Sequence, residues 1–320
     1  MKCVVTGAAG FIGSRLAAHL LAEGHVVVGV DCFTDYYPRH IKERNLAPLR
    51  TSPSFRFLAE DLNTMDLGGL LDGVEAVFHL AAQAGVRASW GTSFDAYITN
   101  NIRATQRLLE AARGRPLRRF VFASSSSVYG LTRDLPMRET SPVQPLSPYG
   151  VTKLSAEQLC VLYNRNYGVP TVALRFFTVY GPGQRPDMAF HRFFQALAED
   201  REITVYGNGD QTRDFTYVDD IVAANLAALD RGRPGEVYNV GGGHRERLAD
   251  VIRVMEDVAA LKARITHTEA QKGDVPDTYA DIRKARDELG YEPRTALQDG
   301  LREEWVWLRG LYASSRHQEG

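Results

Sequence analysis

The chain has 320 residues, in which 38 Lys and Arg residues nearly balance 39 Asp and Glu residues. This composition is typical of a globular protein, and the missing basic excess argues against nucleic acid as a partner. Charges or glycines interrupt every apolar stretch, so we expect no membrane span; without a signal peptide, we expect a cytoplasmic protein. The scattered cysteines Cys3, Cys32 and Cys160 suggest neither a disulfide framework nor a metal site.

Short β-branched runs alternate with amphipathic stretches through the first half of the chain. This alternation indicates βαβ units and a doubly wound, parallel, Rossmann-type α/β sheet. In chain order, the pattern predicts strand 3–6, helix 11–23, strand 25–30, strand 55–58, strand 76–80, helix 94–112, strand 119–123, helix 155–167 and strand 171–175.

The pattern changes after Gly181, where Pro182, Gly183 and Pro186 interrupt it. We therefore place a domain boundary near residues 178–182 and expect a smaller C-terminal α/β domain for a substrate. A helix-like stretch at 219–229 and a strand-like stretch at 236–239 predict a return to the first domain. The expected division is residues 1–178, rejoined by about 219–243, against residues 179–218 and 244–320.

A glycine-rich turn with Gly7, Gly10 and Gly13 follows the first strand and opens the first helix at Phe11 and Ile12. Such glycines allow a tight turn and let the backbone approach a pyrophosphate, which the free N–H groups of the helix N-terminus then bind. An ordinary glycine-rich turn is the alternative, but a strand before and a helix after the glycines favour dinucleotide binding.

Asp31 ends the second strand, 18 residues after Gly13, where an acidic residue binds the adenosine ribose in this fold. Its carboxylate would repel a 2′-phosphate, so we predict NAD rather than NADP. Asp61 and Leu62, after the third strand, are candidates for the adenine edge or, equally, for a helix cap. We expect His79 to pack within its strand. The small residues that follow it, Leu80, Ala81 and Ala82, are candidates for contact with the nicotinamide ribose.

Tyr149 and Lys153 are the candidate catalytic pair, because residues four apart on a helix share one face. A nearby ammonium stabilises a phenolate and lowers the pKa of the tyrosine toward a value useful for proton transfer. The serines 124–127, which end an apolar strand, strengthen this interpretation over a flexible linker or a surface pair.

Together these motifs resemble the extended short-chain dehydrogenase/reductases, and specifically their NAD-dependent sugar-nucleotide epimerase and dehydratase branch. The resemblance covers nearly the whole chain, through TGAAGFIGS, HLAAQ, SSSSVYG, YGVTK, RFFTVYGPGQRPDMAF and RDFTYVDD. RFFTVYGP followed by RPDMA is most similar to the UDP-glucuronate 4-epimerases of that branch. The resemblance therefore implies an isomerase that acts on a UDP-sugar, and a homodimer formed through helices 94–112 and 155–167.

The resemblance also implies residue roles. Ser125, Tyr149 and Lys153 correspond to the catalytic set, and Asn101 and Phe177 to residues beside the cofactor. Arg213 corresponds to an arginine that meets the diphosphate, and Tyr206, in the stretch that begins at Thr204, to an aromatic residue that stacks on uracil. Where many relatives carry a second diphosphate arginine, this chain has Gln271 and Lys272.

The residues after Ser125 distinguish reactions within the branch. Dehydratases carry Asp-Glu at the positions of Ser126 and Ser127, and decarboxylating enzymes carry Glu at the second position. Serine at both positions argues against dehydration and decarboxylation and favours epimerisation at C4. A UDP-glucose or UDP-N-acetylglucosamine 4-epimerase, a UDP-glucuronate decarboxylase and a non-catalytic dinucleotide sensor remain as alternatives.

An enzyme that acts on a glucuronate substrate must bind and hold its carboxylate. Ser126, Ser127 and Thr178 are neutral donors suited to it, and the planar fork of Arg185 suits a carboxylate. The alternative to substrate binding is that Arg185 forms an ion pair with Asp187 in the same loop. Arg87, in the loop after the fourth strand, is a further candidate.

Overall fold

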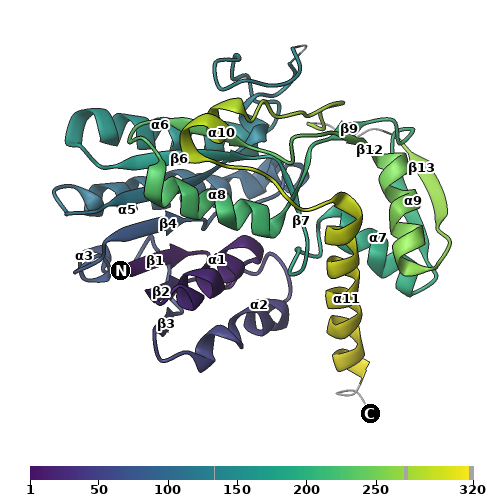
Figure 1. Cartoon of the computed structure of the whole chain (residues 1–320), viewed down its shortest axis with the longest axis horizontal. Coiled ribbons are helices and arrows are strands. Elements are labelled where there is room, and N and C mark those ends of the chain that lie inside the picture. The colour runs from purple at the N-terminus through teal and green to yellow at the C-terminus, as the bar shows by residue number, and fades with distance from the viewer. Residues whose placement is uncertain (133, 270–272, 317–320) are drawn as a thin grey trace.

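A parallel sheet of seven strands forms the centre of the computed structural model, which describes residues 1–132, 134–269 and 273–316. The strand order is β11-β6-β5-β4-β1-β2-β3, as expected for a doubly wound sheet (Figure 1). The strands are β1 (Lys2–Thr6), β2 (Val26–Val30), β3 (Phe55–Leu58), β4 (Ala76–His79), β5 (Arg119–Ser125), β6 (Thr171–Phe176) and β11 (Val237–Val240).

Most of these strands consist mainly of apolar residues, as expected for a parallel sheet that helices cover on both faces. The helices α1 (Phe11–Ala22) and α8 (Val218–Arg231) pack on one face and share a buried apolar cluster that includes Leu16 and Ile221. On the other face, α3 (Leu67–Leu70), α5 (Ala104–Ala112) and α6 (Pro148–Tyr167) share a second cluster that includes Leu108 and Cys160. The predicted fold class is confirmed.

The helix predicted at 94–112 is continuous but not uniform. A π-helical segment, Ile98–Arg103, separates α4 (Phe94–Tyr97) from α5. The wider turn changes which face each residue presents, a shift that helical periodicity alone does not reveal. The helix expected to carry Tyr149 and Lys153 and to continue through 155–167 is α6, which begins at Pro148. Ser147 caps it by accepting a hydrogen bond from the Gly150 backbone N–H at 3.1 Å.

The rest of the chain forms smaller units beside the sheet. Three two-stranded sheets pair β7 (Thr178–Tyr180) with β10 (Phe215–Tyr217), β8 (Glu202–Tyr206) with β13 (Arg264–Thr268), and β9 (Thr212–Arg213) with β12 (Glu246–Arg247). The remaining helices are α2 (Arg39–Leu46), α7 (Ala189–Ala198), α9 (Leu248–Ala259), α10 (Arg283–Leu289) and α11 (Leu297–Arg316).

The chain returns to the central sheet as predicted, because β11 pairs in parallel with β6. The exact division into domains stays a prediction. Across the ranges that the structure describes, no helix is long and apolar enough to cross a membrane.

A buried ion pair ties α6 to the sheet. Arg175 of β6 donates to both carboxylate oxygens of Glu157 on α6, at 2.6 and 3.0 Å, and both side chains are nearly inaccessible. The Ser124 hydroxyl donates to the same carboxylate at 2.6 Å. One carboxylate therefore fixes α6 to the ends of β5 and β6.

We predict that Glu157→Ala lowers the free energy of unfolding by about 3–5 kcal/mol, because Arg175 is left as an unpaired buried charge. Urea denaturation followed by circular dichroism measures this change. Asp230→Ala is the matched control: it breaks an exposed pair with Arg118 and is expected to cost less than about 1 kcal/mol. Equal losses in the two variants would contradict the prediction.

Candidate functional site

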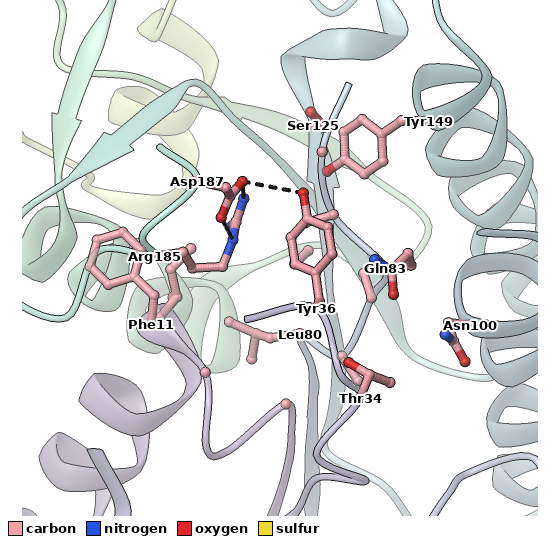
Figure 2. Close-up of a pocket in the computed structure, with 18 of the residues that line it drawn as sticks. Phe11, Thr34, Tyr36, Leu80, Gln83, Asn100, Ser125, Tyr149, Arg185 and Asp187 are labelled. Carbon is pink, nitrogen blue, oxygen red and sulfur yellow. Dashed lines mark hydrogen bonds and ion pairs between the residues drawn. The ribbon is translucent and has the colours of Figure 1, made fainter. Parts of the chain in front are cut away.

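A cavity of about 710 Å³ lies at the carboxyl ends of the central strands. The sheet changes direction between β1 and β4, and in doubly wound sheets ligands bind in the crevice at that point. Figure 2 shows side chains from several loops converging on this cavity, with Ser125 and Tyr149 side by side and an ion pair of Arg185 with Asp187 nearby.

The glycine turn lines one wall of the cavity. Gly7 has a φ of +70°, and a Cβ there would lie 2.9 Å from the Ala81 backbone nitrogen. A Cβ on Gly13 would collide with the Gly7 carbonyl. Gly10 precedes α1 without a side-chain cap, so the first N–H groups of the helix are left for an anion.

Asp31, at the end of β2, also lines the cavity. Its carboxylate accepts backbone hydrogen bonds from Phe33 at 2.9 Å and Ala9 at 3.2 Å, which holds it beside the glycine turn. Lys42, which the sequence analysis did not single out, lies 4.0 Å from it and is buried in the same wall. The sequence signal for Lys42 was its rarity, since the chain contains only six lysines.

The stretches after β3 and β4 reach the cavity where they were expected. Asp61 and Leu62 line it, and Asp61 accepts the Asn63 backbone N–H at 2.8 Å within a turn. The alternative role of Asp61 as a helix cap is wrong, because Asp66 caps the helix that follows, α3. His79 is buried between hydroxyls of Thr6 and Thr105, at 2.7 and 2.9 Å. The residues that follow His79 form the adjoining wall: Leu80, Ala81 and Ala82.

Ser125, Tyr149 and Lys153 meet in the cavity, as the motifs predicted. Burial raises the pKa of Tyr149, and the Ser125 hydroxyl and Arg185 lower it only in part. Burial also lowers the pKa of Lys153 to about 8. The expected lowering of the tyrosine pKa by Lys153 is not found: Lys153 is not among the groups that shift this pKa, and burial of the phenol outweighs the effects of Ser125 and Arg185.

A second group of predicted residues lies in the same cavity: Ser126, Ser127, Phe177, Thr178 and Arg185. Arg185 forms a two-point ion pair with Asp187 at 2.9 Å, so the alternative pairing is present within the site itself. Burial alone would lower the pKa of Arg185, but Asp187 raises it above its ordinary value. Tyr36, unforeseen in the sequence, donates to Asp187 at 3.3 Å (Figure 2).

At the far end of the cavity, Arg87 stacks over the Tyr206 ring at 4.2 Å and pairs with Asp274 at 2.6 Å. Thr204 and Arg213, by contrast, lie outside the described cavity lining. Arg213 instead donates to the carbonyl oxygens of Thr212 and Pro276, both at 2.9 Å. The predicted departure at Gln271 and Lys272 falls outside the described residues.

Asn101 also differs from expectation. It is buried outside the described lining, donates to the Gln83 carbonyl at 3.0 Å and the Thr152 hydroxyl at 2.9 Å, and accepts the Gln83 backbone N–H at 2.7 Å. Its neighbour Asn100 lines the cavity instead. Both asparagines lie in the π-helical segment, whose wider turn the sequence did not reveal.

The model of the NAD dependent epimerase/dehydratase family matches residues 3–241. The chain belongs to this family. It is 48% identical to the uncharacterized UDP-glucose epimerase YtcB of Bacillus subtilis, over 98% of this chain and 99% of that protein. It is 39% identical to a UDP-glucuronate 4-epimerase of Thermodesulfobacterium geofontis, over 96% and 95%. Among solved structures, the UDP-glucuronic acid 4-epimerase of Bacillus cereus with UDP-glucuronic acid and NAD aligns with a TM-score of 0.95 and 45% identity, over 98% of this chain and all of that one.

The residues present fit the family's cofactor, NAD. A Cβ at Gly7 or Gly13 would collide with neighbouring backbone, so only glycine keeps this turn tight, and both glycines line the cavity beside the uncapped N-terminus of α1. Asp31 supplies a carboxylate at the position that reads the ribose hydroxyls.

We predict that Lys153→Met raises the free energy of unfolding by about 3 kcal/mol at pH 7, because a buried ammonium with a pKa near 8 is removed. The difference in the free energy of unfolding between variant and wild type should shrink as the pH rises from about 8 to 10.5. In that range Lys153 has lost its proton in the folded protein but keeps it in the unfolded chain. Chemical denaturation at several pH values measures this gap. Lys262→Met, at an exposed lysine, should change little at any pH, and a constant gap for Lys153→Met would refute the prediction.

Proposed function

We propose that the chain is an NAD-dependent 4-epimerase that converts UDP-glucuronate to UDP-galacturonate. One observation carries this proposal: Ser126 and Ser127 line the same cavity as Tyr149 and Lys153, where a dehydratase or decarboxylase would place an acid. Arg185, a cation suited to a carboxylate, lies in that cavity too. The names of the Thermodesulfobacterium and Bacillus cereus proteins support the same substrate.

In the proposed mechanism, Tyr149 takes the proton of the C4 hydroxyl, with Ser125 hydrogen-bonded between phenol and substrate. We assign to Lys153 the supply of positive charge within the same cavity, which favours the phenolate when the proton must leave. Bound NAD supplies the hydride chemistry, by accepting the C4 hydride and returning it to the opposite face of the ring. Tyr149 gives the proton back at that stage, so the enzyme ends as it began.

The 4-keto sugar creates a specific hazard, because its carboxylate is then β to a ketone. If the C5–C6 bond aligns with the carbonyl π system, it breaks, its electron pair moves toward the C4 oxygen, C5 takes a proton and CO₂ leaves. We assign the restraint of that carboxylate to Ser126, Ser127, Thr178 and Arg185. Neutral hydroxyls grip it without the repulsion that a Glu at position 127 would bring.

The nucleotide must stay bound while the ring turns over. Tyr206 lines the cavity and is our candidate to stack on uracil, and Arg87, whose guanidinium lies over one face of that ring, is a candidate for the diphosphate. We place Arg213 at the diphosphate by its family position, although it would have to swing from its present carbonyl partners. Thr204, on the strand that ends at Tyr206, belongs to the same end of the site.

A UDP-glucose 4-epimerase is the second candidate, because the Bacillus subtilis relative is named an uncharacterized UDP-glucose epimerase. The test is to incubate the purified protein with UDP-glucuronate, UDP-glucose or UDP-N-acetylglucosamine, without added NAD, and to separate the products by chromatography. Formation of UDP-galacturonate as the main product supports the proposal. A preference for UDP-glucose would overturn the substrate assignment, and inactivity with all three sugars would favour a sensor.

We also propose that the protein is a cytoplasmic homodimer. Ile98, Val151 and Leu162 are exposed apolar residues on neighbouring helical segments, a surface that a second copy would bury. Light scattering after gel filtration tests this proposal, and a monomer at micromolar concentration would exclude it.

We predict that Tyr149→Phe keeps the fold and bound NAD but loses about 10²–10⁴-fold in turnover, because only the acid/base group is removed. Steady-state kinetics measure the loss, and the nucleotide released on denaturation shows whether NAD is retained. Near-normal turnover by a folded variant would contradict the mechanism.

We further predict that Ser127→Glu, Thr178→Ala and Arg185→Ala each yield less UDP-galacturonate and release CO₂ with a UDP-4-keto-pentose or UDP-pentose. The first adds a negative charge beside the substrate carboxylate, and the others remove a donor. Mass spectrometry of the nucleotide products decides the outcome. If all three variants are slow yet make only the two uronates, these residues do not restrain the carboxylate.

A further inference from the structure

The loop between β7 and α7, residues 181–188, carries Arg185 into the cavity. Within it, Asp187 holds the Arg185 guanidinium, so the arginine side chain moves with the loop. The back of this loop lies against α11, the C-terminal helix that stands beside β7 and α7 (Figure 1). The packing also includes two polar contacts: a buried one joins α11 directly to the loop, and a partly buried one joins α11 to His191 of α7, which itself bonds to the loop.

The first contact holds the start of the loop. Glu304 of α11 is fully buried, and its Oε2 accepts the Gly181 backbone N–H at 2.8 Å. Its Oε1 has no hydrogen-bond partner among the described residues, and burial raises the pKa of the carboxyl well above its ordinary value. Gly181 has a φ of +127°, and a Cβ there would lie 2.9 Å from Tyr217 and Val218, so the backbone is closely confined at this point.

The second contact holds the backbone at Gln184, the residue just before Arg185. Gln184 is buried; its side chain donates to the Val179 carbonyl at 3.1 Å and accepts the His191 backbone N–H at 2.9 Å. The Gln184 carbonyl lies 2.8 Å from His191 Nδ1. A carbonyl can only accept, so Nδ1 carries the proton, and Nε2 of the neutral ring accepts the Tyr312 hydroxyl of α11 at 3.1 Å.

These side chains are outside the described cavity lining, so none of them is placed to touch substrate or cofactor. We propose that Glu304, His191 and Tyr312 are positioning residues, which hold the 181–188 loop against α11 so that Arg185 stays aimed at the substrate carboxylate. This inference rests on the proposed function, because it concerns the fate of that carboxylate. A loosened loop lets the carboxylate of the 4-keto sugar rotate, and a misplacement of about 1 Å is enough to change a reaction's course.

The test uses purified, NAD-loaded protein with UDP-glucuronate and measures the ratio of CO₂-loss products to UDP-galacturonate by mass spectrometry. Tyr312→Phe removes one hydroxyl and keeps the ring beside His191. His191→Asn keeps an N–H near the Nδ1 position for the Gln184 carbonyl, whereas His191→Phe loses both contacts. Glu304→Gln keeps an oxygen for Gly181, whereas Glu304→Leu removes it.

We expect His191→Phe and Glu304→Leu to raise the ratio by about fivefold or more, the factor that matches one net hydrogen bond. Tyr312→Phe and His191→Asn should raise it less, and Glu304→Gln should restore the wild-type ratio. Leu308→Ala is the control, because it removes a buried apolar side chain of α11 and should lower the melting temperature without changing the ratio.

The positioning role is wrong if the ratio stays at the wild-type value in every folded His191, Tyr312 and Glu304 variant, whatever the loss of rate. It is also wrong if Leu308→Ala raises the ratio as much, since general loosening would then explain the effect. If the wild type makes no UDP-galacturonate, the proposed function itself fails, and the positioning role fails with it. An active wild type whose variants all keep the wild-type product ratio would instead refute the positioning role alone.

Discussion

The geometry of the site depends on one buried carboxylate. Glu157 binds Arg175 of β6 and the hydroxyl of Ser124 on β5, and it lies one helical turn beyond Lys153 on α6. Because α6 is fixed to the ends of two strands at this point, Tyr149 reaches the cavity beside Ser125. The ion pair is also an energetic constraint, since burying two charges is tolerated only when their hydrogen bonds are nearly ideal. Removing either partner would therefore disturb both the core and the position of the catalytic helix.

Charge in this part of the core is arranged for chemistry as well as for packing. Burial lowers the pKa of Lys153 to about 8, while Glu157 works against that change. Burial likewise lowers the pKa of His79 to about 3, with Lys153 acting in the same direction, so the imidazole is neutral and serves as a hydrogen-bonding strut between Thr6 and Thr105. Within this group, the ammonium of Lys153 therefore has the pKa closest to neutral pH, and Lys153 lines the same cavity as Tyr149.

Local sequence predicted those parts of the site that short-range geometry determines. The turn of Gly7 to Gly13, the carboxylate of Asp31 and the face shared by Tyr149 and Lys153 each follow from spacing within one element. Contacts between distant segments were not predictable in this way. The pairing of Tyr36 with Asp187, 151 residues apart, depends on how two loops meet over the cavity. The role of Asn101 beside the cofactor stays a prediction; it lies in the π-helical segment, outside the described cavity lining that its neighbour Asn100 joins.

The chain leaves the central sheet after β6 and comes back to it at β11. After β6 the chain leaves the central sheet, builds β7 to β10, and returns as α8 and β11 before it leaves again. The central sheet is therefore not built from one contiguous stretch of sequence. A fragment ending at residue 178 would expose the hydrogen-bonding edge of β6 and the apolar face that α8 covers, and such an open edge invites aggregation. The part of this protein that contains the central sheet cannot be excised by a single cut, because residues 1–178 would have to be joined to α8 and β11.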